Sequence, residues 1–396
     1  MTLDIEQIRA DTPGCINRIH FHNSGSSLMP KAVYDATVDH LQLELNIGGY
    51  EAAAQSAERI DQFYSATARM LGCAQSEVAY MENATAAFNS VFYGFARKLG
   101  VGDRILTANA EYASNFIAYL HVASITGCEI DVIPNDANGQ IDCEALETMI
   151  DERVKLISIT HVPTNCGLVN PAAAVGEVAS RHGIPYLLDA CQSAGQMPLD
   201  VATLKVDAMT VTGRKYLRGP RGTGFLYIRE SAMDHFPPAS LDLHGARWVE
   251  LDRFEMSAGA SRHENFENNV AGQIGLGVAI DYALALGLDN IYQRIQYLAD
   301  RLRQRLGFID GITLADQGIE KCGIVAFAHR QIEPAVFRAR LGAMGINVGT
   351  SNARSTLLDM RSRGIESVVR CAVHYFNTEE EIDRLMESIK SVISNK

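Results

Sequence analysis

The chain has 396 residues, of which 47% are hydrophobic and 21% are charged, a composition typical of a soluble globular protein long enough for two domains. Its net charge of −12 gives no general affinity for phosphate backbones, and it lacks a run of lysine and arginine, so nucleic-acid binding is not expected. No apolar run reaches the roughly 18 residues of a membrane span, so no membrane contact is expected either.

The amino-terminal sequence and the cysteines favour a cytoplasmic protein. Residues 1–9 include acidic side chains and no long apolar stretch, unlike a secretory signal. The eight cysteines form no CxxC pair and no metal-ligand spacing, which favours reduced thiols. His20 and His22 alternate along a strand-like segment without further ligands nearby, so we expect no metal site.

Residues 75–228 alternate short β-rich runs with longer helical stretches. This alternation predicts an α/β domain in which helices cover both faces of a mostly parallel sheet. The predicted strands span 78–81, 104–108, 130–134, 156–160, 186–189, 208–212 and 225–228. In such a sheet, functional side chains gather at the carboxyl ends of the strands.

The pattern changes after two helices predicted within 270–306. Two strands are then predicted at 322–327 and 368–373, and two helices at 333–341 and 379–393. This mixture indicates a second, smaller α+β domain. We therefore divide the chain into an amino-terminal segment (1–16), a large domain (17–284) and a small carboxy-terminal domain (285–396).

Two charged residues stand at the ends of predicted strands in the large domain. Asp189 ends the strand 186–189, and Lys215 follows the strand 208–212 through a short turn. A lysine that forms a Schiff base and an aspartate that pairs with a pyridinium nitrogen are the two groups that pyridoxal phosphate requires of a protein. Either residue alone fits a solvated charge, but the pair in this order favours the cofactor.

These two residues belong to a series of motifs that resembles the fold type I enzymes dependent on pyridoxal phosphate, specifically the class V aminotransferase and cysteine desulfurase branch. The resemblance covers nearly the whole chain, and it implies a mostly parallel seven-stranded sheet between helices plus a smaller α+β carboxy-terminal domain. The matched segments are 83–85, 110–115, 161–167, 189–192, 212–215 and 368–378.

The resemblance implies a cofactor site assembled from these segments. Residues 83–85 open a helix predicted at 86–99, whose amino terminus would hold the phosphate, although a simple helix cap is the alternative. Tyr112 would stack on the cofactor ring, or else is a core tyrosine. Thr164, with Asn165 as its alternative, would bind the phenolic oxygen. The expected cofactor contacts are Ala84, Thr85, Tyr112, Thr164, Asp189, Gln192, Thr212, Arg214, Lys215 and Asn269.

The resemblance also implies a small amino-acid substrate and a homodimer with shared active sites. Arg370 would bind the substrate α-carboxylate through two parallel hydrogen bonds, unless it is a strand arginine that faces solvent. Tyr50, after a glycine turn, and Asn23 are further expected substrate contacts. Asn268 or Asn269 would reach the phosphate in the neighbouring subunit.

The expected reaction is β-elimination from an S-substituted cysteine or its sulfoxide. A cysteine desulfurase needs a mobile cysteine in the loop before the arginine strand, and residues 347–356 contain none. Short elements at 48–50, 111–115, 214–222 and 374–378 are similar to those of hercynylcysteine sulfoxide lyases of ergothioneine biosynthesis. A class V aminotransferase is the second expectation and an amino-acid epimerase the third, since all three reactions use the same groups.

Two other classes of protein are disfavoured. A nucleotide-binding α/β protein would carry GxxxxGK[ST] or GxGxxG between a strand and a helix, and neither occurs. An interaction protein without cofactor would have no reason to retain every expected cofactor contact.

Overall fold

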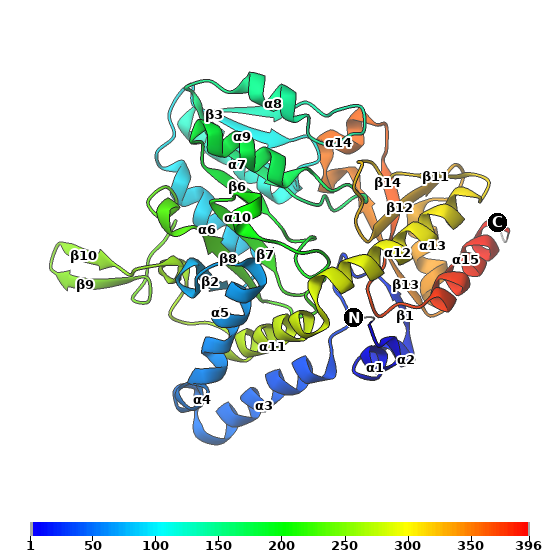
Figure 1. Ribbon diagram of the computed structural model, residues 1–396, viewed down its shortest axis with the longest axis horizontal. Coiled ribbons are helices and arrows are strands. Elements are labelled where there is room, and N and C mark those ends of the chain that lie inside the picture. The colour runs from blue at the N-terminus through cyan, green and yellow to red at the C-terminus, as the bar shows by residue number, and fades with distance from the viewer. Residues whose placement is uncertain (1–2, 395–396) are drawn as a thin grey trace.

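The computed structural model describes residues 3–394 and contains two separate multistranded sheets joined by long helices (Figure 1). The larger sheet has seven strands in the order β2-β8-β7-β6-β5-β3-β4. Only β8 runs antiparallel to its neighbours, so the predicted mostly parallel sheet is confirmed. Its strands are β2 (Val78–Met81), β3 (Arg104–Ala108), β4 (Glu129–Ile133), β5 (Val154–Thr160), β6 (Tyr186–Asp189), β7 (Ala208–Thr212) and β8 (Gly224–Ile228).

Helices cover both faces of this sheet, which explains why its strands are nearly continuous apolar runs. Successive residues of β6 serve opposite faces: Leu187 joins the core beneath α6 and α7, whereas Leu188 joins the core beneath α5, α9 and α11. The helices of this domain are α3 (Lys31–Ile47), α4 (Gly49–Gln55), α5 (Ala57–Leu71), α6 (Ala84–Ala96), α7 (Ala113–Thr126), α8 (Cys143–Met149), α9 (Ala172–His182), α10 (Val201–Leu204) and α11 (Val270–Leu286).

The smaller sheet has five strands in the order β1-β13-β14-β12-β11 and its own hydrophobic core. Its strands are β1 (Ile19–Phe21), β11 (Ile312–Leu314), β12 (Ile324–His329), β13 (Ile346–Asn352) and β14 (Ser367–Ala372). The helices on this side are α1 (Ile5–Ala10), α2 (Gly14–Asn17), α12 (Leu288–Gly307), α13 (Pro334–Ala343), α14 (Leu357–Ser362) and α15 (Glu379–Ser394). No single helix among residues 3–394 is long and apolar enough to cross a membrane, and α11 with α12 passes that test only as a pair bent by 79°.

Two expectations about the small domain need correction. Strand β1 falls in the range 17–284 assigned to the large domain, but it pairs in parallel with β13 and its Phe21 lies in the small core. Residues 347–356, expected to be a loop, form most of β13 and a short 3-10 helix. Gly349 suggested a loop, yet it is needed inside the strand, because a Cβ there would lie 2.8 Å from the His22 ring. The boundaries at 17 and 285 otherwise stay predictions.

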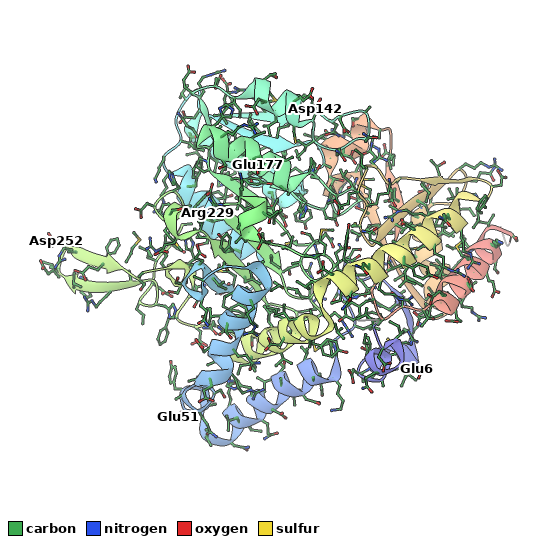
Figure 2. The ribbon with its side chains drawn as sticks, viewed as in Figure 1. Glu6, Glu51, Asp142, Glu177, Arg229 and Asp252 are labelled. Atoms are coloured by element: carbon green, nitrogen blue, oxygen red, sulfur yellow. The ribbon has the colours of Figure 1, made fainter. Side chains whose placement is uncertain are left out.

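A β-hairpin that the sequence pattern did not predict projects from the large domain (Figure 1). It consists of β9 (Ala246–Glu250) and β10 (Arg253–Met256), and Figure 2 shows Asp252 at its outer end. Its strands are short and largely exposed, with Trp248 75% accessible. Periodicity alone does not distinguish such a short pair from a loop.

The chain before α3, residues 3–30, is bonded to both domains through buried arginine contacts, and it is called the amino-terminal segment from here on. Arg218, fully buried in the loop after Lys215, donates to the Leu28 carbonyl (2.7 Å), the Tyr375 hydroxyl (2.8 Å) and the Thr12 hydroxyl (2.5 Å). No carboxylate accepts from this guanidinium, whose carbon lies 4.7 Å from the centre of the Phe376 ring. Neutral oxygens and aromatic faces thus stabilise this buried cation.

Two further contacts complete this attachment. The Ser27 amide donates to the Arg214 carbonyl at 2.9 Å, directly beside Lys215. Arg9 forms an ion pair with Glu381 of α15 at 2.8 Å. The amino-terminal segment therefore contacts the loop that carries Lys215 as well as the carboxy-terminal helix.

Candidate active site

The carboxyl ends of the central strands surround a cavity of about 420 Å³. All of the expected cofactor contacts except Asn269 line it. The lining residues are Asn83, Ala84, Thr85, Tyr112, Asn115, Thr160, Val162, Thr164, Asp189, Cys191, Gln192, Thr212, Arg214, Lys215, Arg221 and Gly222. The fold thus brings together residues that span 140 positions of the sequence, as the strand-end argument predicts.

Asp189 and Asn115 line one side of the cavity, and Glu111 lies behind them, bonded to Asn115 but outside the lining; we call these three residues the Asp189 wall. One Asp189 oxygen accepts from the Asn115 amide and the other from the Cys191 backbone N–H, both at 2.9 Å. The same Asn115 nitrogen donates to Glu111 at 2.9 Å. Burial raises the pKa of Glu111 to about 7. Asp189 is therefore held in one orientation by a second, more deeply placed carboxylate.

The phosphate end of the cavity combines a helix terminus with arginines. The Asn83 side chain caps α6 by accepting from the Ala86 N–H at 2.9 Å, and the helix N–H groups nearest the cavity have no partner within the helix. Gly224 permits the close approach of β8, because a Cβ there would lie 3.3 Å from the Ala84 nitrogen. The Arg214 guanidinium donates to the Thr212 hydroxyl at 2.8 Å.

Arg221 also lines this cavity, although the prediction did not include it as a contact. It was visible in the sequence as part of the 214–222 element. No carboxylate is paired with it among the described ion pairs, so its charge is available to an anionic ligand.

Lys215 lies between the two sides of the cavity, after the end of β7. Burial lowers the pKa of its amine, and the charges of Arg214 and Arg370 act in the same direction. A neutral amine is therefore accessible at a lower pH than for a lysine in water. The pKa of the neighbouring Cys191 thiol shifts in the opposite direction, because burial and the charge of Asp189 raise it well above the usual value.

A second group, which we call the Arg370 wall, consists of the cavity-lining residues Thr164 and Gln192 and of Arg370, which is bonded to Thr164 but does not itself line the cavity. Arg370 is 8% exposed and donates through Nη1 to the Thr164 carbonyl (2.6 Å) and hydroxyl (2.7 Å). Burial lowers the pKa of its guanidinium to about 10, so it remains a cation at neutral pH. Its Nε and the Gln192 Oε1 are buried without a hydrogen-bond partner. Buried polar atoms of this kind are normally satisfied, which indicates a ligand on this side.

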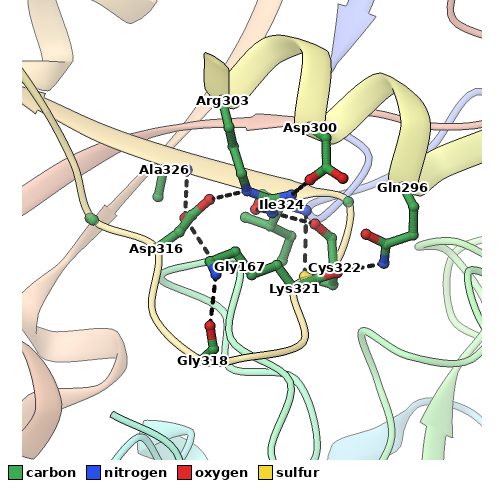
Figure 3. A network of polar contacts seen from close by, with 12 residues as sticks. Gly167, Gln296, Asp300, Arg303, Asp316, Gly318, Lys321, Cys322, Ile324 and Ala326 are labelled. Carbon is green, nitrogen blue, oxygen red and sulfur yellow. Dashed lines mark hydrogen bonds and ion pairs between the residues drawn. The ribbon is translucent and has the colours of Figure 1, made fainter. Parts of the chain in front are cut away.

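A buried hydrogen-bond network connects the loop that carries Thr164 to the small domain (Figure 3). Asp316 accepts from the Gly167 N–H at 2.9 Å and from the Ala326 N–H at 3.0 Å, and Arg303 donates to its other oxygen at 2.7 Å. This links the loop that carries Thr164 to β12. Asn165 turns to the same side and donates to Asp359 at 2.7 Å, so Thr164 and not Asn165 lines the cavity.

Four predicted site residues do not line the cavity of their own chain: Arg370, described above, and Tyr50, Asn23 and Asn269. Tyr50 is 75% exposed on α4. Asn23 is fully buried, but its amide donates to the Ala372 carbonyl at 2.7 Å and its oxygen accepts from the Ser27 hydroxyl at 2.7 Å, so it attaches the segment after β1 to the small sheet. Asn269 caps α11 by accepting from the Gly272 N–H at 2.8 Å. The sequence elements resembled a site, whereas partners within the chain already occupy the Asn23 and Asn269 side chains.

The residues present fit pyridoxal phosphate. Asp189 can pair with a protonated ring nitrogen, and Lys215 offers an amine to an aldehyde. The amino terminus of α6 with Arg214 and Arg221 suits a phosphate dianion. The buried, unpartnered Gln192 oxygen and Arg370 Nε mark the side on which further polar ligand groups would lie. Within residues 3–394, no group of three or more potential metal ligands occurs.

Comparison with known proteins identifies relatives over the whole chain. Residues 19–385 match the family model described as aminotransferase class-V. A probable cysteine desulfurase of Methanothermobacter thermautotrophicus is 26% identical over 98% of both chains. A cysteine desulfurase of Escherichia coli is 28% identical over 99% of both. The apo structure of a cysteine desulfurase from Thermococcus onnurineus superposes with a TM-score of 0.92 at 26% identity, covering 100% of this chain and 99% of that one.

Proposed function

The chain belongs to the class V aminotransferase family of enzymes dependent on pyridoxal phosphate, and on this basis we propose that it is a C–S β-lyase. The substrate is an S-substituted cysteine or its sulfoxide. Cleavage of the Cβ–S bond, followed by addition of water, releases pyruvate, ammonia and the sulfur-containing leaving group. Transamination and epimerisation of an amino acid are the alternative outcomes at the same groups.

The observation that carries this proposal is the absence of a usable thiol near Arg370. Relatives of this chain are called cysteine desulfurases, and formation of a protein persulfide would need a cysteine at the substrate. Strand β13, whose Gly349 pairs with Arg370, contains no cysteine, and neither do the following residues to 356. Elimination from the substrate itself requires no protein thiol.

Cys191 is the one cysteine that lines the cavity of the described chain, and it is poorly suited to sulfur transfer. It stands two residues after Asp189, and its raised pKa keeps the thiol protonated. Because the thiolate is the nucleophile, this cysteine is a weak sulfur acceptor. The other seven cysteines do not line the cavity.

Lys215, Asp189 and Arg370 each have a separate role in elimination. When bound, pyridoxal phosphate withdraws electrons from the substrate α-carbon, which acidifies its proton. The Lys215 amine, with its lowered pKa, removes that proton. The Asp189 carboxylate holds the proton on the ring nitrogen. Arg370, oriented by two bonds to Thr164, binds the substrate carboxylate with the remaining N–H groups of its guanidinium.

Product analysis tests this assignment. The holoprotein is mixed with S-alkyl cysteines and their sulfoxides, and pyruvate and ammonia are quantified. We expect both products from the wild type and from Cys191→Ser, and neither from Lys215→Ala. Borohydride reduction followed by mass spectrometry should place the cofactor adduct on the peptide that contains Lys215. Stoichiometric conversion of the cofactor to pyridoxamine phosphate by alanine or glutamate, with no elimination from any tested thioether or sulfoxide, would favour the aminotransferase instead.

We also propose that the enzyme is a cytoplasmic homodimer with shared active sites. Asn268 Oδ1 is buried without a partner, and Phe266 beside it is 46% exposed, which suits a segment that contacts a second subunit. Sedimentation should give about twice the chain mass of 43.3 kDa. A monomer that retains its cofactor would contradict the shared site.

A further inference from the structure

Glu111 is a buried carboxylate behind the active site that the proposed reaction does not use. It is 2% exposed and has no cation among its hydrogen-bond partners. Its two oxygens nevertheless accept five hydrogen bonds from the surrounding chain. Taking a carboxylate so far out of water is costly, so its retention behind the cofactor cavity calls for a physical reason.

Each Glu111 oxygen accepts from one backbone N–H group. Oε1 accepts from the Tyr112 N–H and Oε2 from the Thr160 N–H, both at 2.9 Å. Oε1 also accepts from the Thr160 hydroxyl at 2.5 Å, and Oε2 from the Thr107 hydroxyl at 3.2 Å. Hydroxyl groups can rotate, but backbone N–H groups cannot. The site therefore requires acceptors on both sides, which a carboxylate supplies and a carboxamide does not.

The fifth bond connects Glu111 to Asn115, which lines the cavity and also bonds Asp189. The Asn115 amide nitrogen donates to Glu111 Oε1 and to Asp189 Oδ2, at 2.9 Å each. The two hydrogens of this amide are thus divided between the carboxylates: one is donated to Glu111 and the other to Asp189. The orientation of the Asp189 side chain is fixed from behind by Glu111 through Asn115.

Glu111 also controls the backbone of a second cavity residue. Tyr112, whose N–H it holds, lines the cavity and begins α7. From this geometry we propose that Glu111 is a positioning residue for the cofactor ring: it fixes Asp189 through the Asn115 amide and Tyr112 through its backbone N–H. This inference rests on the cofactor of the proposed function, and it holds whether the reaction is elimination or transamination.

Cofactor binding, measured without turnover, tests the proposal. Apoprotein is titrated with pyridoxal phosphate, and the circular dichroism of the bound cofactor is recorded in the visible range. For Glu111→Gln we expect affinity about tenfold to hundredfold weaker and an altered cofactor dichroism signal, because one backbone N–H then faces an amide nitrogen. Asn115→Ala should produce the same kind of change. In the Asn115→Ala background, Glu111→Gln should add less than in the wild type, because the two residues act partly through one bond.

Glu264→Gln provides the matched control. Glu264 is equally deep in the large domain (5% exposed) and also accepts from a backbone N–H, that of Tyr80 at 2.7 Å, but it does not line the cavity. Both Gln variants should unfold more easily, whereas the cofactor signal should change only for Glu111→Gln. Equal cofactor affinity and dichroism in the two variants, or fully additive effects with Asn115→Ala, would overturn the proposal.

The proposal can still be decided if Glu111→Gln does not fold, or if the wild type shows no elimination. If Glu111→Gln does not fold, Asn115→Ala alone decides the matter, and an unchanged cofactor signal in that variant refutes the link. If the wild type binds pyridoxal phosphate but eliminates nothing, the proposed reaction fails while this inference stands.

Discussion

The two sides of the cavity differ in how completely their polar atoms are satisfied. On the Asp189 wall, both Asp189 oxygens and both Glu111 oxygens have donors within the chain. On the Arg370 wall, the Gln192 oxygen and the Arg370 Nε are buried without partners. The first wall is complete before any ligand binds, whereas the second offers groups that only a ligand can satisfy.

This difference assigns separate tasks to the two walls. A preorganised carboxylate loses little freedom when it meets its partner, so the Asp189 wall is suited to the permanently bound cofactor. The Arg370 wall gains hydrogen bonds only on ligand binding. Its cation Arg370 is suited to a substrate that enters and leaves in each cycle, whereas Thr164 and Gln192 are expected to contact the cofactor. Substitutions of Asp189 and of Arg370 should therefore affect different measured quantities.

Removing the carboxylate of the Asp189 wall should have the largest effect. Asp189→Ala leaves the Asn115 amide and the Cys191 N–H without acceptors and the cofactor ring nitrogen without its counter-charge. We expect a loss of about 3–5 kcal/mol in pyridoxal phosphate binding, the range for breaking a buried charge pair. Equilibrium titration of the apoprotein measures this loss. An affinity within threefold of the wild type, which corresponds to a loss of less than about 0.7 kcal/mol in binding free energy, would show that the Asp189 wall does not hold the cofactor.

Removing the cation of the other wall should affect the substrate and not the cofactor. Arg370→Ala should lower kcat/KM by about 2–4 kcal/mol, largely through KM, because a charge-assisted bidentate contact is lost. Cofactor affinity should stay close to that of the wild type. Arg370→Lys is the control: it keeps the charge but not the planar fork, so it should recover only part of the loss. Cofactor loss as severe as in Asp189→Ala would mean that the walls do not have separate tasks.

The pH dependence of stability should reveal the buried carboxylate of the Asp189 wall. Because the pKa of Glu111 is raised from 4.5 to about 7, the folded protein binds one more proton than the unfolded chain between these pH values. The stability that Glu111 contributes must therefore fall as the pH rises through this window, by at most about 1.4 kcal/mol per pH unit. Denaturant unfolding at pH 5, 6 and 7 should give a steeper decline for the wild type than for Glu111→Gln. Parallel curves would show that Glu111 does not titrate here.

The smallest effect is expected from Gln192→Leu. Leucine removes the buried, unpartnered oxygen together with the bond from Gln192 Nε2 to the Ser24 carbonyl (3.1 Å), so the two changes nearly cancel in the apoprotein. Binding of pyridoxal phosphate should weaken by about 1 kcal/mol, the net value of one hydrogen bond. Thermal unfolding measured with and without cofactor separates the change in cofactor binding from the change in stability of the apoprotein. A large loss of stability in the apoprotein would show that Gln192 supports the fold and not the ligand.

Asp189 and Lys215 could be predicted from the sequence pattern itself, for a physical reason, whereas Thr164, Gln192 and Arg370 were expected only through the family resemblance. Asp189 and Lys215 follow buried strands, whose apolar runs are easily recognised, and parallel strands must bring their carboxyl ends together. Asn115 was noticed only as part of a motif, because its bond to Asp189 spans 74 positions and depends on how α7 packs. Arg221 was visible in an element but lacked a distinguishing spacing.

The small domain was harder to predict, because its strands are irregular in composition. β13 contains Gly349, Ser351 and Asn352, residues that favour turns, yet tertiary pairing with β14 makes the segment a strand. Strand β1 has only three residues, too few to reveal which sheet it joins. Asn23 was expected at the substrate because of the resemblance, and only the structure shows that the Ala372 carbonyl and the Ser27 hydroxyl already use its side chain.

The attachment of the amino-terminal segment has a consequence for biosynthesis. Thr12 and Arg9 are synthesised long before their partners, since Arg218 follows Thr12 by 206 positions and Glu381 follows Arg9 by 372. The amino-terminal segment therefore cannot form these bonds until two much later parts of the chain have been synthesised. The bond from Ser27 to the Arg214 carbonyl needs neither Tyr375 nor Glu381, so the loop that carries Lys215 can gain it before the small domain is complete.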